Sequence, residues 1–439
     1  MNLSRLFASN LLWRGTYLFT SLLVTIFMSR YLEAYTTGWL FYLISILTFL
    51  FMALSFGIDS AITYFVARDE IDTGKMQWFI WTWVLMVTVV TTAGSFVFFK
   101  EGNEFATSAR LIVMTVLFVS GNLLITFYNA LFYAKHQYKI PNIVFIIVNL
   151  LLLFLLLNPK WPGLDANSFI YVFFYSYVLQ GVFIAFLFNI KFSKKFRFQF
   201  PSAAQRKQLF RYSHLAFFAG LLFYLVTRVD YWLIDYFTHD KEALGNYIQA
   251  SRLVQLFQLL PAILAAGIFP IAASGYVQQM REGILKLSRV IVLMYVLVLI
   301  VIGLTGKWLF PFLFGRSFNK MDDVFLLLMP GLMALSLLAL MAAYFAAINQ
   351  IRRNLLISLA GLVVIIIADV LLIPPFGIYG AAIASSIGYL VCFIIAYMYF
   401  AGEGTITITD LLLFKKQDID FLMGLAEKIQ SAETTNEKA

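Results

Sequence analysis

Charged residues are scarce in this chain: Asp, Glu, Lys and Arg make up 13% of its 439 residues, whereas hydrophobic residues make up 62%. A soluble globular protein is about one quarter charged and about half apolar. The mean hydropathy of +0.85 agrees with this imbalance. The lack of charge therefore excludes a soluble protein and predicts an all-α polytopic membrane protein.

Metal ligands and disulfide partners are equally scarce. The single cysteine, Cys392, lies in an apolar run, so no intramolecular disulfide is expected. His136, His214 and His239 have no ligand-like spacing, and no HxxxH or HExxH motif occurs, so no metal site is predicted. A cleavable signal peptide is not expected either, because Arg14 interrupts the first apolar run and no small-residue cleavage site follows it.

Large extramembrane segments are missing as well. About twelve apolar segments are long enough to cross a bilayer as helices, and mostly short connectors join them. The predicted helices cover residues 6–29, 38–66, 77–99, 109–134, 141–157, 167–190, 211–236, 244–273, 284–305, 323–348, 354–373 and 377–400. A membrane glycosyltransferase or glycan polymerase would need catalytic groups in a sizeable loop. Since Asp322-Asp323 begins a helix and forms no D-x-D motif, the sequence favours a transporter over an enzyme and predicts no catalytic residue.

The longest internal connector is strongly basic and carries no acid. Its basic residues are Lys191, Lys194, Lys195, Arg197, Arg206, Lys207 and Arg211. Because short cytoplasmic segments are enriched in Lys and Arg, this connector places both termini in the cytoplasm. It also falls at the midpoint of the helix count, which predicts an N-terminal six-helix lobe, a basic cytoplasmic connector, a C-terminal six-helix lobe and a cytoplasmic tail. The predicted limits are residues 1–195, 196–210, 211–400 and 401–439.

The two halves carry similar short motifs. F-x-A-x-x-Q-x-[KR] occurs at residues 132–139 and again at 345–352. Gly38-Trp39 and Gly245-Asn246-Tyr247 open corresponding predicted helices. With six helices in each half, the halves run in the same sense through the membrane. Parallel repeats of this kind place a substrate site at their interface, near the bilayer midplane.

Several blocks along the chain together resemble one known family. They are Arg30-Tyr31-Leu32, Phe56-Gly57-Ile58, the D-Y-W-L-I-D run at 230–235, Leu244-Gly245-Asn246-Tyr247, Leu260-Pro261-Ala262, Leu313-Phe314-Gly315 and the I-P-P-F-G-I-Y-G-A-A run at 373–382. In order and spacing they are similar to the lipid-linked oligosaccharide (O-antigen, Wzx-type) flippases. These belong to the multidrug/oligosaccharidyl-lipid/polysaccharide exporter (MOP) superfamily. The resemblance extends from the N-terminus to about residue 400.

The resemblance implies two parallel six-helix lobes around a central cavity in a bacterial inner membrane. It implies alternating access that carries an undecaprenyl-pyrophosphate-linked oligosaccharide from the inner to the outer leaflet during surface polysaccharide synthesis. The implied partners are the lipid-linked glycan and membrane lipid, with a glycan polymerase and glycosyltransferases as candidates and no nucleic acid. No cofactor is expected, and coupling to an H⁺ or Na⁺ gradient is left open.

Two other functions are compared with that of a lipid-linked oligosaccharide flippase. A multidrug/cation antiporter of the same superfamily should have an acidic cavity, whereas three of the candidate intramembrane charges here are arginines. The same arginines argue against a purely structural membrane scaffold, because ionised side chains at membrane depth are costly.

Intramembrane charges are the candidate substrate-binding residues: Arg14, Arg228 and Arg252, with Asp59 and Asp230 as charge partners. Arg14 and Asp59 lie at similar depths, so they form either a structural ion pair or a phosphate contact oriented by Asp59. Arg228 and Asp230 are two residues apart and face different sides of a helix. Asp230 is therefore predicted to pair with Arg252, whose role beyond structure stays open, while Arg228 faces the cavity. A planar guanidinium suits a pyrophosphate because it donates two parallel hydrogen bonds.

Three further features have two interpretations each. Pro261, Gly267 and Pro270 free backbone groups, so they predict either a simple kink or a hinge for alternating access. Asp369 is expected to reach water near a helix end, although a coupling role is also open. In the tail, a short amphipathic helix beginning near Asp418 is expected to pack on the bundle.

Overall fold

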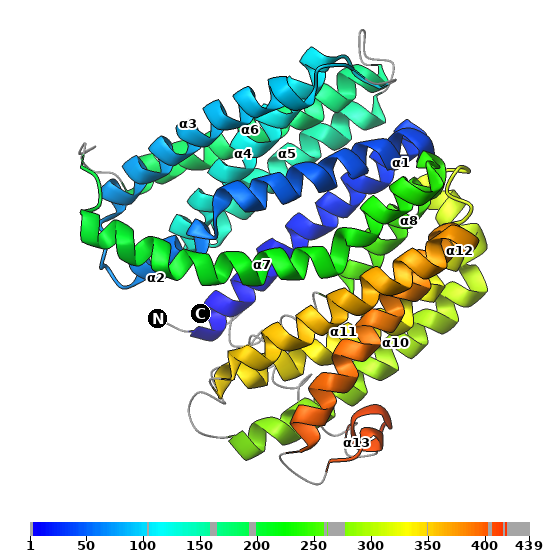
Figure 1. Cartoon of the computed structure of the whole chain (residues 1–439). Coiled ribbons are helices and arrows are strands. Elements are labelled where there is room, and N and C mark those ends of the chain that lie inside the picture. Colours follow the sequence, from blue (N-terminus) through cyan, green and yellow to red (C-terminus); the bar gives the residue numbers. More distant parts are fainter. Residues whose placement is uncertain are drawn as a thin grey trace, which may run out of the picture. The chain divides into compact units, whose positions relative to one another are not determined.

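The computed structural model consists of helices throughout the part of the chain that it describes (Figure 1). That part comprises residues 3–102, 105–158, 165–192, 199–258, 261, 277–348, 350–402, 406–415 and 418. The helices are α1 (Leu3–Ser55), α2 (Ile58–Ala67), α3 (Thr73–Phe98), α4 (Ser108–Ala134), α5 (Lys139–Leu157), α6 (Ala166–Phe192), α7 (Ala203–Thr238), α8 (Lys241–Leu256), α10 (Val277–Phe314), α11 (Met321–Ala347), α12 (Ile351–Ala401) and α13 (Ile408–Leu412).

Nine of the described helices are long and apolar enough to cross a membrane. Two of these, α1 and α12, contain a break that divides each into two arms. The breaks lie at Glu33, with φ 59°, and at Gly377, with φ 57°, two residues after Pro375. The left-handed backbone region interrupts a right-handed helix, so each break separates two predicted helices. The prediction of an all-α multi-pass membrane protein is confirmed.

The chain divides into two compact units. Unit 1 comprises Met1–Tyr224 and Leu313–Ser317, and unit 2 comprises Leu225–Phe312 and Phe318–Ala439. The division falls inside α7 and thus differs from the predicted limits at residues 195 and 211. The reason is that the first part of α7 packs on the break between α1 and α2, where Phe56 stacks on Phe217 with ring centres 5.1 Å apart. The predicted arrangement of two lobes around a central cavity stays a prediction.

In unit 1, α4 packs closely against α6. A Cβ atom added at Gly121 would lie 2.6 Å from the backbone of Tyr177, so only glycine allows this approach. Towards the other end of the pair, Phe132 meets Phe188 edge to face, with ring centres 5.0 Å apart. Both phenylalanines are fully buried. Unit 1 therefore has an aromatic core between α4 and α6.

In unit 2, polar side chains join α10, α11 and α12 to one another. The hydroxyls of Tyr295 and Ser336 are 2.7 Å apart, and Ser386 donates to the carbonyl of Leu327 at 2.6 Å. Within α12, the buried thiol of Cys392 joins the two arms of the helix by donating to the carbonyl of Ile357 at 3.4 Å. Such side-chain hydrogen bonds stabilise helix packing in a membrane, because the surrounding lipid provides no hydrophobic driving force between helices.

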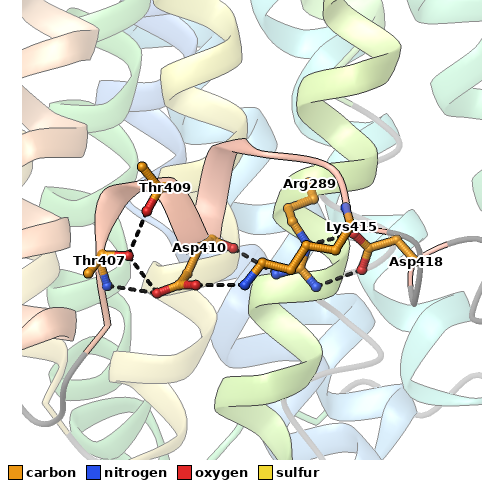
Figure 2. A network of polar contacts seen from close by, with 6 residues as sticks. All are labelled: Arg289, Thr407, Thr409, Asp410, Lys415 and Asp418. Carbon is orange, nitrogen blue, oxygen red and sulfur yellow. Dashed lines mark hydrogen bonds and ion pairs between the residues drawn. The ribbon is translucent and has the colours of Figure 1, made fainter.

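The segment after α12 is held against α10 by charged contacts (Figure 2). Arg289 makes two hydrogen bonds of 2.6 Å to the carboxylate of Asp418, and both side chains are buried, at 5% and 0% exposure. Arg289 also donates to the carbonyl of Asp410 at 2.7 Å, while Lys415 forms an exposed ion pair with the Asp410 carboxylate. We call Arg289, Asp410, Lys415 and Asp418 the tail clasp. The amphipathic helix predicted after Asp418 lies outside the described residues.

Candidate functional site

The predicted inner pair does not form an ion pair. Arg14 is exposed on α1, and Asp59 is half-buried in the first turn of α2. No ion pair joins them in the described part of the chain, and Arg14 is not among the groups that influence the Asp59 carboxyl. The prediction assumed one continuous helix over 38–66, whereas the backbone turns at Phe56 and Gly57. Asp59 consequently stands at the start of α2, where a carboxylate is favoured by the free N–H groups of the helix end.

Arg228 donates hydrogen bonds to two neutral side chains, and its charge interacts with that of Asp230. Its guanidinium donates to the hydroxyl of Tyr231, one turn further along α7, and to the side-chain oxygen of Gln255 on α8 at 2.5 Å. It also lies over the Tyr231 ring, with 5.0 Å between the guanidinium carbon and the ring centre. The expectation of an unpaired Arg228 is therefore wrong. Its predicted exposure to a transport cavity stays a prediction.

Asp230 accepts its hydrogen bonds from hydroxyls and a backbone N–H, and Arg252 is not among its partners. The donors are the Tyr247 hydroxyl, the Ser385 hydroxyl at 3.3 Å and the N–H of Tyr231 at 2.9 Å. Asp230 is only 3% exposed. The predicted Asp230–Arg252 pair is therefore wrong.

The geometry of α8 explains this error. Tyr247, Ser251 and Gln255 are four residues apart and form one stripe on the helix. We call these three residues the polar stripe. It faces α7, because Ser251 accepts a hydrogen bond of 3.1 Å from Tyr231 and Gln255 accepts one from Arg228. The half-buried Arg252 follows Ser251 directly and so points about 100° away from the stripe.

Asp369 joins this region from α12. It is completely buried, and neither of its carboxyl oxygens has a hydrogen-bond partner among the described residues. Its charge interacts with that of Asp230, and both interact with Tyr247. The expectation that Asp369 reaches water at a helix end is therefore wrong. We call Asp230 and Asp369 the carboxyl pair.

The carboxyl pair lies where a bare negative charge would be costly. An ionised acid within the membrane pairs with a cation, takes up a proton or faces water. Ser385 and Tyr247 supply two more oxygens beside Asp230. No group of three or more His, Cys, Asp or Glu side chains lies together in the described ranges. The arrangement suits the exchange of a proton or of a small hard cation, which prefers oxygen ligands.

Sequence reasoning missed the polar stripe and Ser385. The stripe is detectable in the sequence, because three polar residues recur at helical spacing within the predicted membrane helix 244–273. No periodic signal connects Ser385 with Asp230, since 155 positions separate them in the chain. The predicted hinge is only partly described: Pro261 is buried, while Gly267 and Pro270 lie outside the described residues.

Comparison with known proteins identifies both a family and a fold. The family whose model matches residues 8–276 has the description "Polysaccharide biosynthesis protein". No curated protein matches the chain. Among solved structures, the lipid II flippase MurJ in an inward closed conformation is similar, with a TM-score of 0.67 and 12% identity over 91% of this chain and 89% of that one.

Two transporters of the MOP superfamily have the same fold. An inward-facing multidrug resistance transporter of the MATE family has a TM-score of 0.67 and 15% identity, covering 88% of this chain and 93% of its own. A transporter from Pyrococcus furiosus has a TM-score of 0.64 and 15% identity, covering 91% and 94%. At such low identities the similarity establishes the fold of a MOP-superfamily transporter and nothing finer.

Proposed function

The chain belongs to the polysaccharide biosynthesis protein family, and from this premise we propose that it is a flippase for a lipid-linked oligosaccharide. The substrate is an undecaprenyl-pyrophosphate-linked glycan, which moves by alternating access from the cytoplasmic to the outer leaflet of a bacterial inner membrane. Both termini lie in the cytoplasm. The glycan is a precursor of O-antigen, capsule or exopolysaccharide, so glycosyltransferases act before this step and a polymerase acts after it.

The geometry of Arg228 is the observation that carries this proposal. A pyrophosphate that leaves water needs a compensating partner, because desolvating an ion costs several kcal/mol. Tyr231 and Gln255 fix the orientation of the guanidinium, and its charge also interacts with that of Asp230. A guanidinium held in this way presents a planar donor surface for the phosphate oxygens.

The carboxyl pair supports a second part of the proposal, coupling to an ion gradient. Asp369 has no hydrogen-bond partner among the described residues, and Asp230 is met by hydroxyls. Uptake of H⁺ or Na⁺ between these carboxyls would remove the cost of their buried charge. Release of the ion would restore that cost. Ion binding and release can in this way favour different conformations of the transporter.

Complementation of a flippase-null strain tests the transport function. The wild-type chain should restore surface glycan, while Arg228→Ala, at an equal protein level, should lower it about tenfold or more and accumulate lipid-linked precursor on the cytoplasmic face. Arg228→Lys should retain part of the activity, because an ammonium offers charge without the planar fork. The matched control is Arg316→Ala, which removes an exposed arginine after α10.

Full glycan export by Arg228→Ala would remove Arg228 from the transport path. Failure of the wild-type chain in strains with different surface glycans, together with protection against cationic drugs, would favour the antiporter instead.

For the coupling ion, proteoliposomes with an imposed Na⁺ or H⁺ gradient should show stimulated transport in the wild type and no stimulation in Asp369→Asn. Undiminished stimulation in that variant would contradict a role for the carboxyl pair.

A further inference from the structure

An apolar groove lies between α5 and α6 in unit 1, whereas the residues of the candidate site belong to unit 2. Its cavity volume is about 640 Å³. Val148, Leu152 and Ser176 form a buried floor, and the exposed side chains of Leu151, Tyr175 and Leu179 form the walls. None of the lining residues is charged, and both helices are candidate membrane spans. The groove therefore opens towards hydrocarbon.

The dimensions of the groove match one hydrocarbon chain of one leaflet. Along α6 its lining residues extend from Val172 to Val182, which corresponds to about 15 Å at the rise of an α-helix. The hydrocarbon core of a bilayer is about 30 Å thick, so each leaflet contributes about half of it. The volume is also within the range of about 300–1,000 Å³ that ligand pockets have.

A cation marks one end of the groove. Arg110, in the first turn of α4, is exposed, and its guanidinium carbon lies 5.4 Å from the centre of the Tyr171 ring. Tyr171 precedes the wall residue Tyr175 by one helical turn, so both rings lie on the same side of α6. The nearby acid is Asp165, whose carboxylate accepts the N–H of Ser168 and whose charge interacts with Arg110. The groove thus extends along α6 from the hydrocarbon region towards the guanidinium of Arg110, which lies near the N-terminal end of α6.

We propose that this groove is a phospholipid site, with one acyl chain between α5 and α6 and the lipid phosphate at Arg110. The charge of Arg110 complements a phosphodiester, and arginine is well suited to phosphate oxygens. The apolar walls bury the chain along the length of one leaflet. A phospholipid is favoured over the much longer polyprenyl chain of a flippase substrate, because the groove has room for the depth of one leaflet only.

Site-specific photocrosslinking tests the acyl-chain part. p-Benzoylphenylalanine at Leu179, in the groove wall, should crosslink phospholipid that copurifies through detergent washing. The same residue at Leu150, exposed on α5 but outside the groove lining, should lose its lipid on washing. The mass of the crosslinked peptide identifies the lipid. Equal crosslinking at both positions, or an adduct with the mass of a polyprenyl lipid, would overturn the proposal.

Native mass spectrometry tests the headgroup part, and its readout does not depend on transport. The wild-type protein should retain about one phospholipid per chain at a detergent concentration that strips Arg110→Ala of it. Lys100→Ala removes an exposed cation from the connector between α3 and α4, and this variant should retain the lipid. Ser176→Leu places a larger side chain on the floor and narrows the groove, so this variant should also retain less phospholipid. Equal lipid retention by Arg110→Ala and the wild type would assign the bound chain to nonspecific hydrocarbon contact.

Discussion

The tail clasp and the carboxyl pair are two places in unit 2 where charge is buried, and they are built in opposite ways. In the tail clasp, Asp418 meets Arg289 in a two-point ion pair (Figure 2). In the carboxyl pair, Asp230 meets hydroxyls, and Asp369 meets no hydrogen-bond donor among the described residues. A matched ion pair fixes one charge state. The two acids instead interact with each other, and Asp230 also interacts with the charge of Arg228 without an ion pair among the described residues, so their charge states can change. The first arrangement suits a structural contact and the second suits a switch.

The largest effect is expected from breaking the matched pair. Asp418→Ala leaves the guanidinium of Arg289 buried without its carboxylate, which should cost about 3–5 kcal/mol of local stability. Hydrogen exchange at residues 406–415 should then become fast. Adding Arg289→Leu should recover much of the protection, since an apolar pair can replace a buried ion pair. Slow exchange in Asp418→Ala alone would show that the buried pair does not hold the tail.

Acidification should weaken the same contact through protonation. Hydrogen bonds from the Arg289 side chain lower the pKa of Asp418 below its ordinary value of 3.8. A lowered carboxyl pKa contributes stability that is complete above the ordinary value and is lost as the pH falls through the folded-state pKa. Limited proteolysis of the tail should therefore be unchanged from pH 7 to about pH 5 and should accelerate only below about pH 4. Acceleration between pH 7 and pH 6 would contradict this assignment.

The carboxyl pair should give a smaller and unequal effect on stability. Asp230→Ala removes the acceptor for Tyr247, Ser385 and the Tyr231 N–H, which should cost about 1–3 kcal/mol. Asp369→Asn removes a charge that has no hydrogen-bond partner among the described residues, so the melting temperature should stay unchanged or rise. Thermal unfolding of the purified variants measures both. A larger loss for Asp369→Asn than for Asp230→Ala would reverse the proposed roles of the two acids.

The smallest effect is expected within the tail clasp itself. Lys415 and Asp410 form an ion pair with 47% and 31% exposed side chains. Exposed pairs contribute about 0–1 kcal/mol, because water screens them. Lys415→Ala should therefore leave hydrogen exchange of the tail within a few-fold of the wild type, in contrast to Asp418→Ala. Equal effects of the two substitutions would mean that burial does not distinguish the two ion pairs.

The positions of most helices could be predicted because hydropathy marks the segments that are long and apolar enough to cross a membrane. Most predicted helices that lie within the described residues coincide with a helix of the structure or with one arm of α1 or α12. The exception is the predicted helix 38–66, which the backbone turn at Phe56 and Gly57 divides between α1 and α2. The Pro-Pro-x-Gly sequence at 374–377 marked the second break, whereas nothing in the identity of Glu33 indicates a left-handed backbone. The family resemblance is confirmed by the match over residues 8–276.

The pairing of charges could not be predicted, because depth in the membrane gives only one coordinate of a side chain. Asp230 and Arg252 were matched by depth, but the orientation of α8 around its axis directs Tyr247 towards Asp230 instead. The predicted pairing of Arg14 with Asp59 was wrong because the backbone turns at Gly57. Asp369 was placed at the surface from its position near a helix end, yet the packing of α12 encloses it completely.

The position of Cys392 has a practical consequence for labelling chemistry. Cys392 is 1% exposed, and its thiol donates to the Ile357 carbonyl and faces Gly361 across the contact between the two arms of α12. A thiol enclosed in this way is inert towards water-soluble maleimides. The natural sequence is therefore already suited to single-cysteine labelling, and an exposed position such as Arg316, changed to cysteine, would carry the only reactive sulfur. A fluorophore or spin label placed there would report on one site of an otherwise unaltered protein.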